Sequence, residues 1–313
     1  RTQAATRFPL AAEMLFTNRS LQQTTEGAIA HFKAELIKEL VPEIKHVTDL
    51  CCGMGGDLQA LATRFNVTGV DLDAKICLIA KHNATLKNQN AVDVITGDAS
   101  EVQLNTDWVH IDPDRRNDGL RHTDVNYLQP GTDTLERLID RIGDSVQGVS
   151  IKLAPASVVP QHWQEQCQLF WIQTRNECRQ QLAVFTCNKE HHDSRTALAI
   201  DKTGAAQWKF SSPNEDLLDS SDVPLKGSVD KFLYEPKPAI LAGHMAPAWA
   251  VSHQLEYIHS GVAYFTSASS HNISGGTCYE ILEELPFALK RIRPVSYTHL
   301  RAHETLRYLV SRL

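Results

Sequence analysis

The chain has 313 residues, of which 42% are hydrophobic and 22% are charged. This length can bury one large core or two modest ones, and the composition is that of a globular protein rather than a disordered one. The formal net charge of −6 argues against broad, charge-driven binding to nucleic acid, although it leaves room for a local basic patch. No apolar run is long enough to span a bilayer and the N-terminal stretch is unlike a signal peptide, so we expect a cytoplasmic protein without a membrane partner.

The cysteines point to the same compartment. There are seven of them, an odd number at irregular spacing with no CxxC pair, so neither a disulfide framework nor a structural zinc site is expected. His191, His192 and Asp193 could begin a metal site, but no further ligand follows at a suitable spacing. We therefore predict a chain from a reducing cytosol that holds no metal.

Residues 1–45 are predicted to form an N-terminal helical segment. Ala28, Phe32, Leu36 and Leu40 recur at helical spacing, and Pro42 ends the helix.

From residue 46 onward, strands and helices alternate. The predicted strands are 46–50, 66–70, 92–96, 108–111 and 148–153, and the predicted helices between them are 58–64, 74–87 and 135–142. This alternation predicts an α/β fold with a doubly wound, Rossmann-like sheet of parallel strands. Further β-rich segments at 169–174, 181–186 and 196–201 could complete the sheet with an antiparallel edge.

The predicted strands, helices and loops divide the chain from residue 46 onward into three units. The α/β domain is predicted over 46–210, a polar, turn-rich linker over 211–228, and a smaller C-terminal α+β unit over 229–294. The chain shows no internal repeat, and nothing in it indicates an oligomeric state.

A glycine-rich turn, Asp49-Leu-Cys-Cys-Gly-Met-Gly-Gly-Asp57, follows the first predicted strand and opens a helix. Glycine permits positive φ and close approach of a ligand to the backbone. The spacing of Gly53, Gly55 and Gly56 is not GxGxxG, which disfavours a dinucleotide site. The acidic Asp49 ahead of the glycines suits a cationic ligand, such as the amino group of a methionine moiety.

Acidic residues also end the next two predicted strands. Asp71 can accept hydrogen bonds from both hydroxyls of a ribose, with Asp73 as a competing candidate, and Asp98 can accept from an adenine amino group. Three acidic strand ends in succession are hard to explain as solvated turns alone.

The segments DLCCGMGGD, GVDLD and TGDAS resemble the first three motifs of class I methyltransferases, which use S-adenosylmethionine (SAM). The resemblance implies a seven-stranded sheet with the cofactor across the carboxyl ends of its strands. It implies that Asp49, Gly53 and Gly55 line the methionine end, that Asp71 binds the ribose, and that Asp98 and Ala99 face the adenine. The predicted cofactor-binding set also includes Gln23, Thr25, Cys51 and Asp57.

A closer resemblance is to bacterial methyltransferases with a THUMP-like C-terminal domain, distant relatives of RNA guanine-N2 methyltransferases of the trimethylguanosine-synthase type. Its motifs match four segments of this chain: Gln23 to Lys33, Asp112-Pro-Asp-Arg-Arg116, Asn176-Glu-Cys178, and Tyr234 to Gly243. The resemblance implies a partial THUMP-like domain over 229–294 and methyl transfer to RNA. Residues 295–313 resemble a translated sequencing adapter, so we expect them to have no function.

The predicted reaction face consists of Asp112, Pro113, Asp114, Arg115 and Arg116, after the fourth strand. Amino-methylating enzymes usually have [DN]-P-P-[YFW] there, where the acid and a backbone carbonyl accept from the amine and the ring stacks on the base. This chain keeps Asp-Pro but lacks the ring. The paired arginines could hold phosphate or clamp a neighbouring aspartate, and Lys152 could add to the same positive rim.

We therefore predict a SAM-dependent methyltransferase whose acceptor is a base in RNA. Two alternatives remain open: a methyltransferase for a small molecule or protein, which the negative charge favours, and a non-catalytic RNA-binding protein that retains the cofactor fold. Cys51 and Cys52 adjoin the cofactor turn, where packing explains them better than nucleophilic catalysis.

Overall fold

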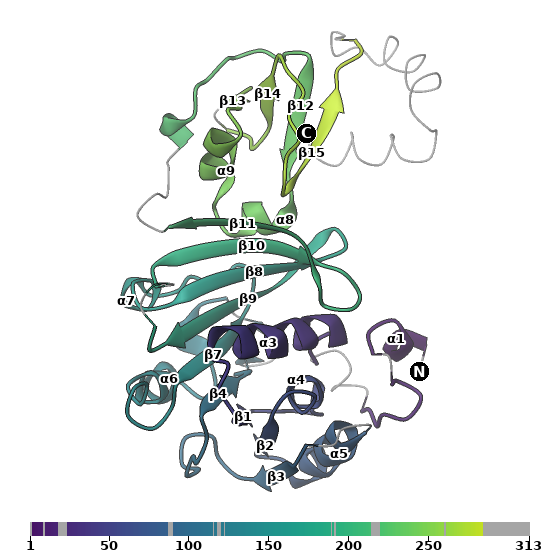
Figure 1. Ribbon diagram of the computed structural model, residues 1–313, viewed down its shortest axis with the longest axis vertical. Helices are drawn as coiled ribbons and strands as arrows, with labels where there is room; N and C mark the ends of the chain where they lie inside the picture. The colour runs from purple at the N-terminus through teal and green to yellow at the C-terminus, as the bar shows by residue number, and fades with distance from the viewer. Residues whose placement is uncertain are drawn as a thin grey trace.

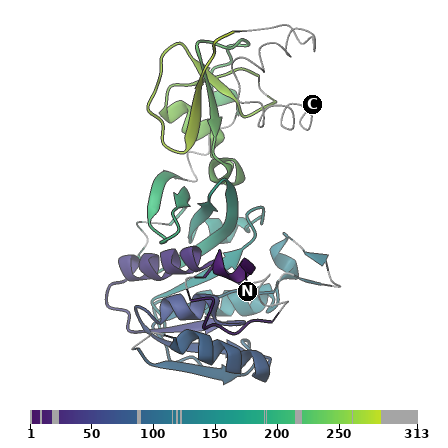
Figure 2. The ribbon, with the colours of Figure 1, turned by 90° about the vertical axis from the view of Figure 1, so that its right-hand side faces the viewer.

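The computed structural model describes residues 2–8, 10–17, 24–86, 90–114, 116–117, 120–121, 123–188, 190, 192–213, 220–259 and 261–283 (Figures 1 and 2). The predicted residues Gln23 and Arg115, and the adapter-like segment 295–313, lie outside the described residues. Within the described part, no helix is long and apolar enough to cross a membrane.

The main body is built on one mixed sheet in the order β11-β10-β8-β9-β7-β4-β1-β2-β3 (Figure 1). Its strands are β1 (His46–Leu50), β2 (Asn66–Asp71), β3 (Val92–Thr96), β4 (Trp108–Ile111), β7 (Gly148–Leu153), β8 (Gln168–Thr174), β9 (Glu177–Thr186), β10 (Ser194–Ile200) and β11 (Ala206–Pro213). The five strands from β3 to β7 are parallel, and β9 runs antiparallel to both of its neighbours.

The fold class is confirmed, but the sheet has nine strands rather than seven. The strands from β3 to β8 supply the expected seven, and the antiparallel member among them, β9, lies inside the sheet and not at its edge. The two additional strands form because β10 pairs in parallel with the outer edge of β8, and β11 then folds back on β10. This hairpin protects an edge that would otherwise present unpaired backbone groups. The sheet consequently runs to Pro213, past the boundary predicted at residue 210.

Helices cover both faces of the sheet. They are α1 (Thr2–Ala5), α3 (Gly27–Leu40), α4 (Gly56–Leu61), α5 (Ala74–Thr85), α6 (Thr132–Ile139) and α7 (Gln161–Gln164), with a short 3-10 turn η1 (Val125–Tyr127). On one face, α3, α4 and α5 bury Ile37, Leu58 and Ala80 against alternate residues of the strands. On the other face, Leu135 of α6 and Trp163 of α7 join a second core.

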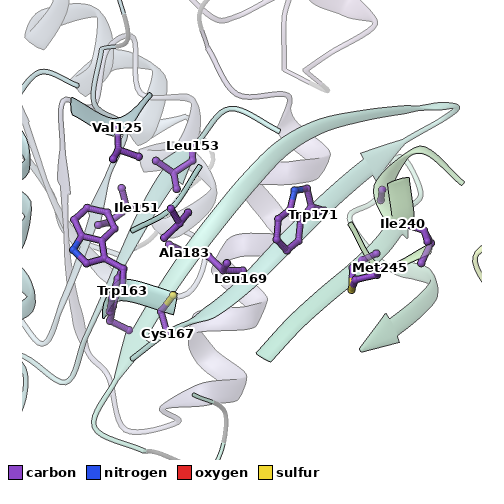
Figure 3. Close-up of a cluster of buried hydrophobic side chains, with 14 of the residues drawn as sticks. Val125, Ile151, Leu153, Trp163, Cys167, Leu169, Trp171, Ala183, Ile240 and Met245 are labelled. Atoms are coloured by element: carbon purple, nitrogen blue, oxygen red, sulfur yellow. The ribbon is translucent and has the colours of Figure 1, made fainter. Parts of the chain in front are cut away.

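The second core continues beyond the sheet. Figure 3 shows it running from Val125 and Trp163 past Leu169 and Trp171 to Ile240 and Met245. The C-terminal part comprises η3 (Ser220–Asp222), β12 (Phe232–Pro236), α8 (Pro238–Ala242), α9 (Ala246–Ser252), β13 (Glu256–Tyr257), β14 (Phe265–Ser267) and β15 (Gly276–Glu280). Its four strands form a separate antiparallel sheet, β13-β14-β12-β15.

The N-terminal segment packs beside the glycine turn. Ala4, Phe8, Ala11 and Met14 bury the side chain of Met54, the middle residue of that turn. Asn83 of α5, fully buried, holds the two segments together: its Nδ2 donates to Leu15 O at 3.0 Å and Met54 O at 2.9 Å, and its Oδ1 accepts from Leu15 N at 2.8 Å. One amide thus fixes both the N-terminal segment and the turn.

We expect Asn83→Ala to lower the free energy of unfolding by about 2–3 kcal/mol, because it leaves buried backbone groups without partners. Asn126→Ala, at an exposed position of η1, is the matched control and should change stability by less than about 0.5 kcal/mol. Urea denaturation of both variants measures the difference. Equal losses would show that the Asn83 amide is not the connection that holds the segment.

Candidate active site

A cleft of about 1390 Å³ opens at the carboxyl ends of β1, β2, β3, β4 and β7. Of the described residues that the sequence assigned to the site, all line the cleft except Gly55 and Arg116. The described residues that line it are Thr6, Arg7, Thr17, Thr24, Thr25, Glu26, Ile29, Asp49, Cys51, Cys52, Gly53, Met54, Gly56, Asp57, Val70, Asp71, Leu72, Asp73, Ile76, Gly97, Asp98, Ala99, Ser100, Asp112, Pro113, Asp114, Gln129, Pro130, Gly131, Thr134, Lys152, Pro155, Arg175, Glu177, Cys178, Arg179 and Gln180.

The glycine turn has a backbone that few side chains tolerate. Cys51, Gly53 and Gly55 have φ angles of 57°, 54° and 81°. A Cβ on Gly53 would meet no atom within 4 Å, so that residue leaves its backbone open to the cleft. A Cβ on Gly55 would lie 3.0 Å from Ala80 O, so this glycine allows α4 and α5 to approach each other.

The two candidates for the ribose contact differ in what their side chains do. Asp73 caps α5, accepting from Lys75 N at 2.8 Å and Ile76 N at 3.4 Å. Asp71 accepts from Gly53 N at 2.9 Å and from Asp73 N at 3.1 Å, which fixes its carboxylate beside the glycine turn at the end of β2. Both residues line the cleft, and Asp71 is the one that is bonded to the glycine turn.

The end of β3 is open to solvent. Asp98 is exposed, and its Oδ1 accepts from Ser100 Oγ at 2.7 Å and Ser100 N at 2.8 Å, which lowers the pKa of the carboxyl group. Ala99 is partly buried beside it. On the same cleft, the side chain of Leu72 is 72% exposed, an apolar surface of the kind that a flat ring can cover.

Asp49 is the most unusual residue of the cleft. It is 1% exposed, and neither oxygen of its side chain has a hydrogen-bond partner among the described residues. Burial, then the nearby charge of Asp57, raises the pKa of Asp49 well above its usual value, while Lys33 opposes the shift. A buried carboxylate without a partner costs free energy, and a cationic ligand would supply the missing interaction.

Asp57 and Thr25, both predicted to bind the cofactor, line the cleft but bind each other. Lys33 Nζ lies 2.5 Å from Asp57 Oδ1, and Thr25 Oγ1 donates to Asp57 Oδ2 at 2.6 Å. Burial raises the pKa of Asp57, but the ammonium of Lys33, with help from His110 and Lys152, overrides it and holds that pKa well below its usual range. Burial also lowers the pKa of Lys33.

The same network reaches the reaction face. Lys152 of β7 donates to Thr25 Oγ1 at 2.9 Å and to Asp112 Oδ2 at 2.5 Å. The Asp112 side chain is 27% exposed and that of Lys152 is 10% exposed, so both can still be reached from the cleft. An unbroken series of contacts thus joins Lys33, Asp57, Thr25, Lys152 and Asp112.

His110 of β4 belongs to this network and was not predicted. Its Nε2 lies 3.1 Å from Lys33 Nζ, and its Nδ1 lies 2.9 Å from Ser150 Oγ. Burial and the charge of Lys33 lower the pKa of His110, which favours a neutral ring that accepts from Lys33 and donates to Ser150. The available sequence signal was a polar residue inside an otherwise apolar strand, which indicates a partner but does not name it.

The remaining reaction-face residues are only partly described. Pro113 and Asp114 line the cleft, and Asp114 exchanges two backbone hydrogen bonds of 2.9 Å with Gln129. Arg116 begins a small hairpin of β5 (Arg116–Asn117) and β6 (Leu120–Arg121), which stands out from the body in Figure 2.

Burial raises the pKa of both Cys51 and Cys52, so neither thiol is activated as a nucleophile. Among the described residues, no three His, Cys, Asp or Glu side chains are grouped so as to hold a metal ion.

Two further segments line the cleft. Arg7 comes from the N-terminal segment, Arg175 from the turn between β8 and β9, and Glu177 and Arg179 from the start of β9. Tertiary packing brings both segments to the site. The resemblance singled out Asn176–Cys178, which includes Glu177, but no local pattern marks Arg7, Arg175 or Arg179.

Residues 47–112, from β1 to the first residue after β4, match the sequence profile of the family described as "Methyltransferase domain". Over these residues the chain carries a methyltransferase domain. No curated protein matches the sequence. The fold is also that of a Porphyromonas gingivalis W83 protein, itself only provisionally assigned as a methyltransferase, with a TM-score of 0.74 and 18% identity over 95% of this chain and 75% of that one.

Two other solved structures are less similar to this chain. A magnesium protoporphyrin IX methyltransferase from Synechocystis PCC 6803 with bound SAM has a TM-score of 0.38 and 15% identity, over 56% of this chain and 86% of that one. A modification subunit from Vibrio vulnificus YJ016, provisionally assigned to a type I restriction enzyme, has a TM-score of 0.42 and 11% identity, over 62% and 55%.

We expect Lys33→Met to lower the free energy of unfolding by about 3–5 kcal/mol, because it leaves Asp57 charged and buried without its cation. Arg64→Met is the matched control. Arg64 pairs at 2.6 Å with Glu35, which lies in α3 as Lys33 does, but both side chains of this pair are about half exposed, so the loss should be under about 1 kcal/mol. Chemical denaturation measures both. Adding Asp57→Asn to Lys33→Met should recover part of the loss, and a failure to do so would contradict the assignment to the ion pair.

Proposed function

We propose that this chain transfers the methyl group of SAM to a nucleotide of RNA held beside Asp112. The observation that supports the proposal most is the arrangement of four carboxylates on one cleft. Asp49 lies near the end of β1, Asp71 ends β2, and Asp98 and Asp112 follow β3 and β4, and these four strands are parallel.

Each part of SAM has a matching group in the cleft. The buried carboxylate of Asp49 suits the cationic methionine end, and the open backbone of Gly53 permits close approach there. Asp71 suits the ribose hydroxyls, while Asp98, Ala99 and the exposed Leu72 suit the adenine. SAM would supply an electrophilic methyl group on a positively charged sulfur.

On the acceptor side, the chain's main contribution is position. Asp112 and the carbonyl of Pro113 can orient an acceptor toward the methyl group, and such alignment is worth several kcal/mol of barrier. A base amine is the acceptor that the Asp-Pro motif suggests. Asp112 Oδ2 already accepts from Lys152, which leaves the other carboxylate oxygen for an acceptor.

The case for RNA rests on charge and place. Arg115, Arg116 and Arg121 follow the Asp-Pro motif in the chain, and Arg116 pairs with Arg121 in the β5–β6 hairpin. A projecting basic hairpin next to the acceptor side suits a phosphate backbone. The rival substrates are a small molecule or a protein, and the rival role is RNA binding without catalysis.

We expect Asp71→Ala to weaken SAM binding by about 2–4 kcal/mol, thirty-fold or more, because it removes two charge-assisted hydrogen bonds. Asp73→Ala is the matched control: it removes a helix cap, so it should cost about 1 kcal/mol of stability with little change in affinity. Titration calorimetry with SAM measures both variants. Unchanged affinity for Asp71→Ala would remove the ribose assignment.

We expect the double variant Arg115→Ala, Arg116→Ala to bind RNA more weakly and with less dependence on salt. Each lost phosphate contact should reduce the log–log salt slope by roughly 0.7 on a single strand. SAM affinity should not change, since neither side chain is assigned to the cofactor. RNA binding measured from low to moderate salt tests this, and an unchanged slope together with lost stability would favour a structural clamp and count against RNA.

A further inference from the structure

We propose that the side-chain amide of Gln180 binds the hydrogen-bonding edge of the acceptor base and so determines which base of the RNA receives the methyl group. This inference rests on the proposed function, because it concerns the acceptor of that same reaction. It adds to the site a residue that no sequence motif had marked.

The first observation is a buried amide without a partner. Gln180, in the first half of β9, lines the cleft and is only 2% exposed. Neither its Oε1 nor its Nε2 has a hydrogen-bond partner among the described residues. Each buried polar atom without a partner costs free energy, and native structures contain few of them. The position of this amide on the cleft therefore indicates that a ligand supplies the missing groups.

Two other glutamines of the same pair of strands show the contrast. Gln173 of β8 and Gln181 of β9 are each 1% exposed. The Nε2 of Gln173 donates to Arg175 O at 2.8 Å, and Gln181, in the orientation that satisfies its amide, donates to Ala154 O at 3.0 Å. The chain thus supplies partners for these two amides, which lie away from the main cleft, but not for that of Gln180, which lines it.

The second observation is the place of Gln180 in the sheet. Lys152 of β7 pairs with Leu182, two residues along β9, so Gln180 and Lys152 share a face of the sheet. Strands lie about 4.8 Å apart, so β9 is about 10 Å from β4, which leads to Asp112, and about 14 Å from β1, which carries Asp49. A group held by Gln180 therefore lies nearer to the acceptor at Asp112 than to the methionine end at Asp49.

The chemistry of an amide selects the ligand. Its N–H donor lies beside its carbonyl acceptor, so both are satisfied only by a group that offers an acceptor beside a donor. A phosphate offers acceptors alone. Nucleobases carry such adjacent pairs on their edges, which glutamine binds with two hydrogen bonds, and in single strands these edges are free. A peptide group offers the same pair, but the basic β5–β6 hairpin, with Arg116 and Arg121, favours a base within RNA.

The base is then held at two points. The oxygen of Asp112 that is not bonded to Lys152 accepts from the reacting group, and Gln180 binds the neighbouring edge. The last torsion of a glutamine side chain is soft, so the amide can turn toward this edge at little cost. No aromatic side chain occurs in the described lining of the cleft, so within that lining hydrogen bonds rather than stacking on a ring orient the base.

The first experiment uses the wild-type chain, SAM labelled in its methyl group, and RNA or protein from cells that lack this chain. We expect label in RNA and, after digestion, in one of the four nucleosides, because the order of donor and acceptor along the edge differs between bases. Label in all four would overturn the role of Gln180 but leave methyl transfer to RNA intact. Label in protein alone, or none, would overturn the proposed function and this inference with it.

The second experiment is Gln180→Met, which keeps the size of the side chain but removes the donor and the acceptor. We expect kcat/KM for RNA to fall about ten- to a hundred-fold, the range of a bidentate contact to a base, with SAM affinity unchanged. The midpoint of urea denaturation should equal or exceed that of the wild type, because the variant no longer buries an unsatisfied amide. A purely structural role for the amide would give the opposite change in stability.

Gln181→Met is the matched control, because it makes the same change at the next residue of β9. It removes hydrogen bonds to Ala154 O and Ser157 O, so the denaturation midpoint should fall while the labelled nucleoside stays the same. Unchanged kcat/KM in Gln180→Met would overturn the proposal. A loss of stability in Gln180→Met as large as that in Gln181→Met would also overturn it, since the amide would then be bonded within the free chain.

Discussion

The buried ion pair between Lys33 and Asp57 is the constraint on which the rest of the site depends. Both side chains are almost fully removed from solvent, where an unpaired charge would cost several kcal/mol. Thr25 Oγ1 donates to Asp57 and His110 Nε2 lies 3.1 Å from Lys33 Nζ, so the ion pair and its partners join α3, α4 and β4 through buried polar contacts. A less specific apolar contact would not define these positions so narrowly.

In this arrangement, two carboxylates of the cleft can still accept hydrogen bonds from a ligand. Lys33 satisfies Asp57, and Lys152 occupies one oxygen of Asp112, but no cation among the described residues bonds to Asp49. Asp49, at the glycine turn, therefore has room for a cationic partner, and Asp112, at the reaction face, has one oxygen bonded to a cation and one that is not. A sulfonium cofactor with an amino group fits the first, and an acceptor that can share Asp112 with Lys152 fits the second.

The sequence predicted most of the fold because local patterns determine the strands of the parallel half. The predicted strand 148–153 is β7 without change, and the strand predicted at 66–70 is longer by only one residue. The segment 196–201 was expected to join the sheet, but its parallel pairing with β8 and the addition of β11 beside it were not, because local patterns do not encode which strands pair. The limits of the helices also shifted, since caps and packing decide where a helix begins.

The site residues that could be predicted from sequence are the acidic residues at the carboxyl ends of predicted strands. Asp49, Asp71 and Asp98 follow strands in sequence, so topology alone places them together. Sequence could not separate Asp71 from Asp73, because the difference is that Asp73 bonds to the first turn of α5. His110 was missed for a related reason: a buried histidine gains meaning only from its contacts.

The charges of the cleft bear on how an acidic chain would bind the proposed polyanionic acceptor. Its exposed carboxylates lie on both sides of Asp112: Asp73 and Asp98 near the ends of β2 and β3, and Asp114 and Glu177 after β4 and at the start of β9. The cations in its described lining are Arg7 of the N-terminal segment, Lys152 of β7, Arg175 of the β8–β9 turn, and Arg179 of β9, which pairs with Glu177 at 3.1 Å. Because screening limits the reach of surface charges to about 10 Å, an acceptor responds to this local distribution more than to the net charge of −6. The net charge alone therefore does not argue against the proposed RNA acceptor.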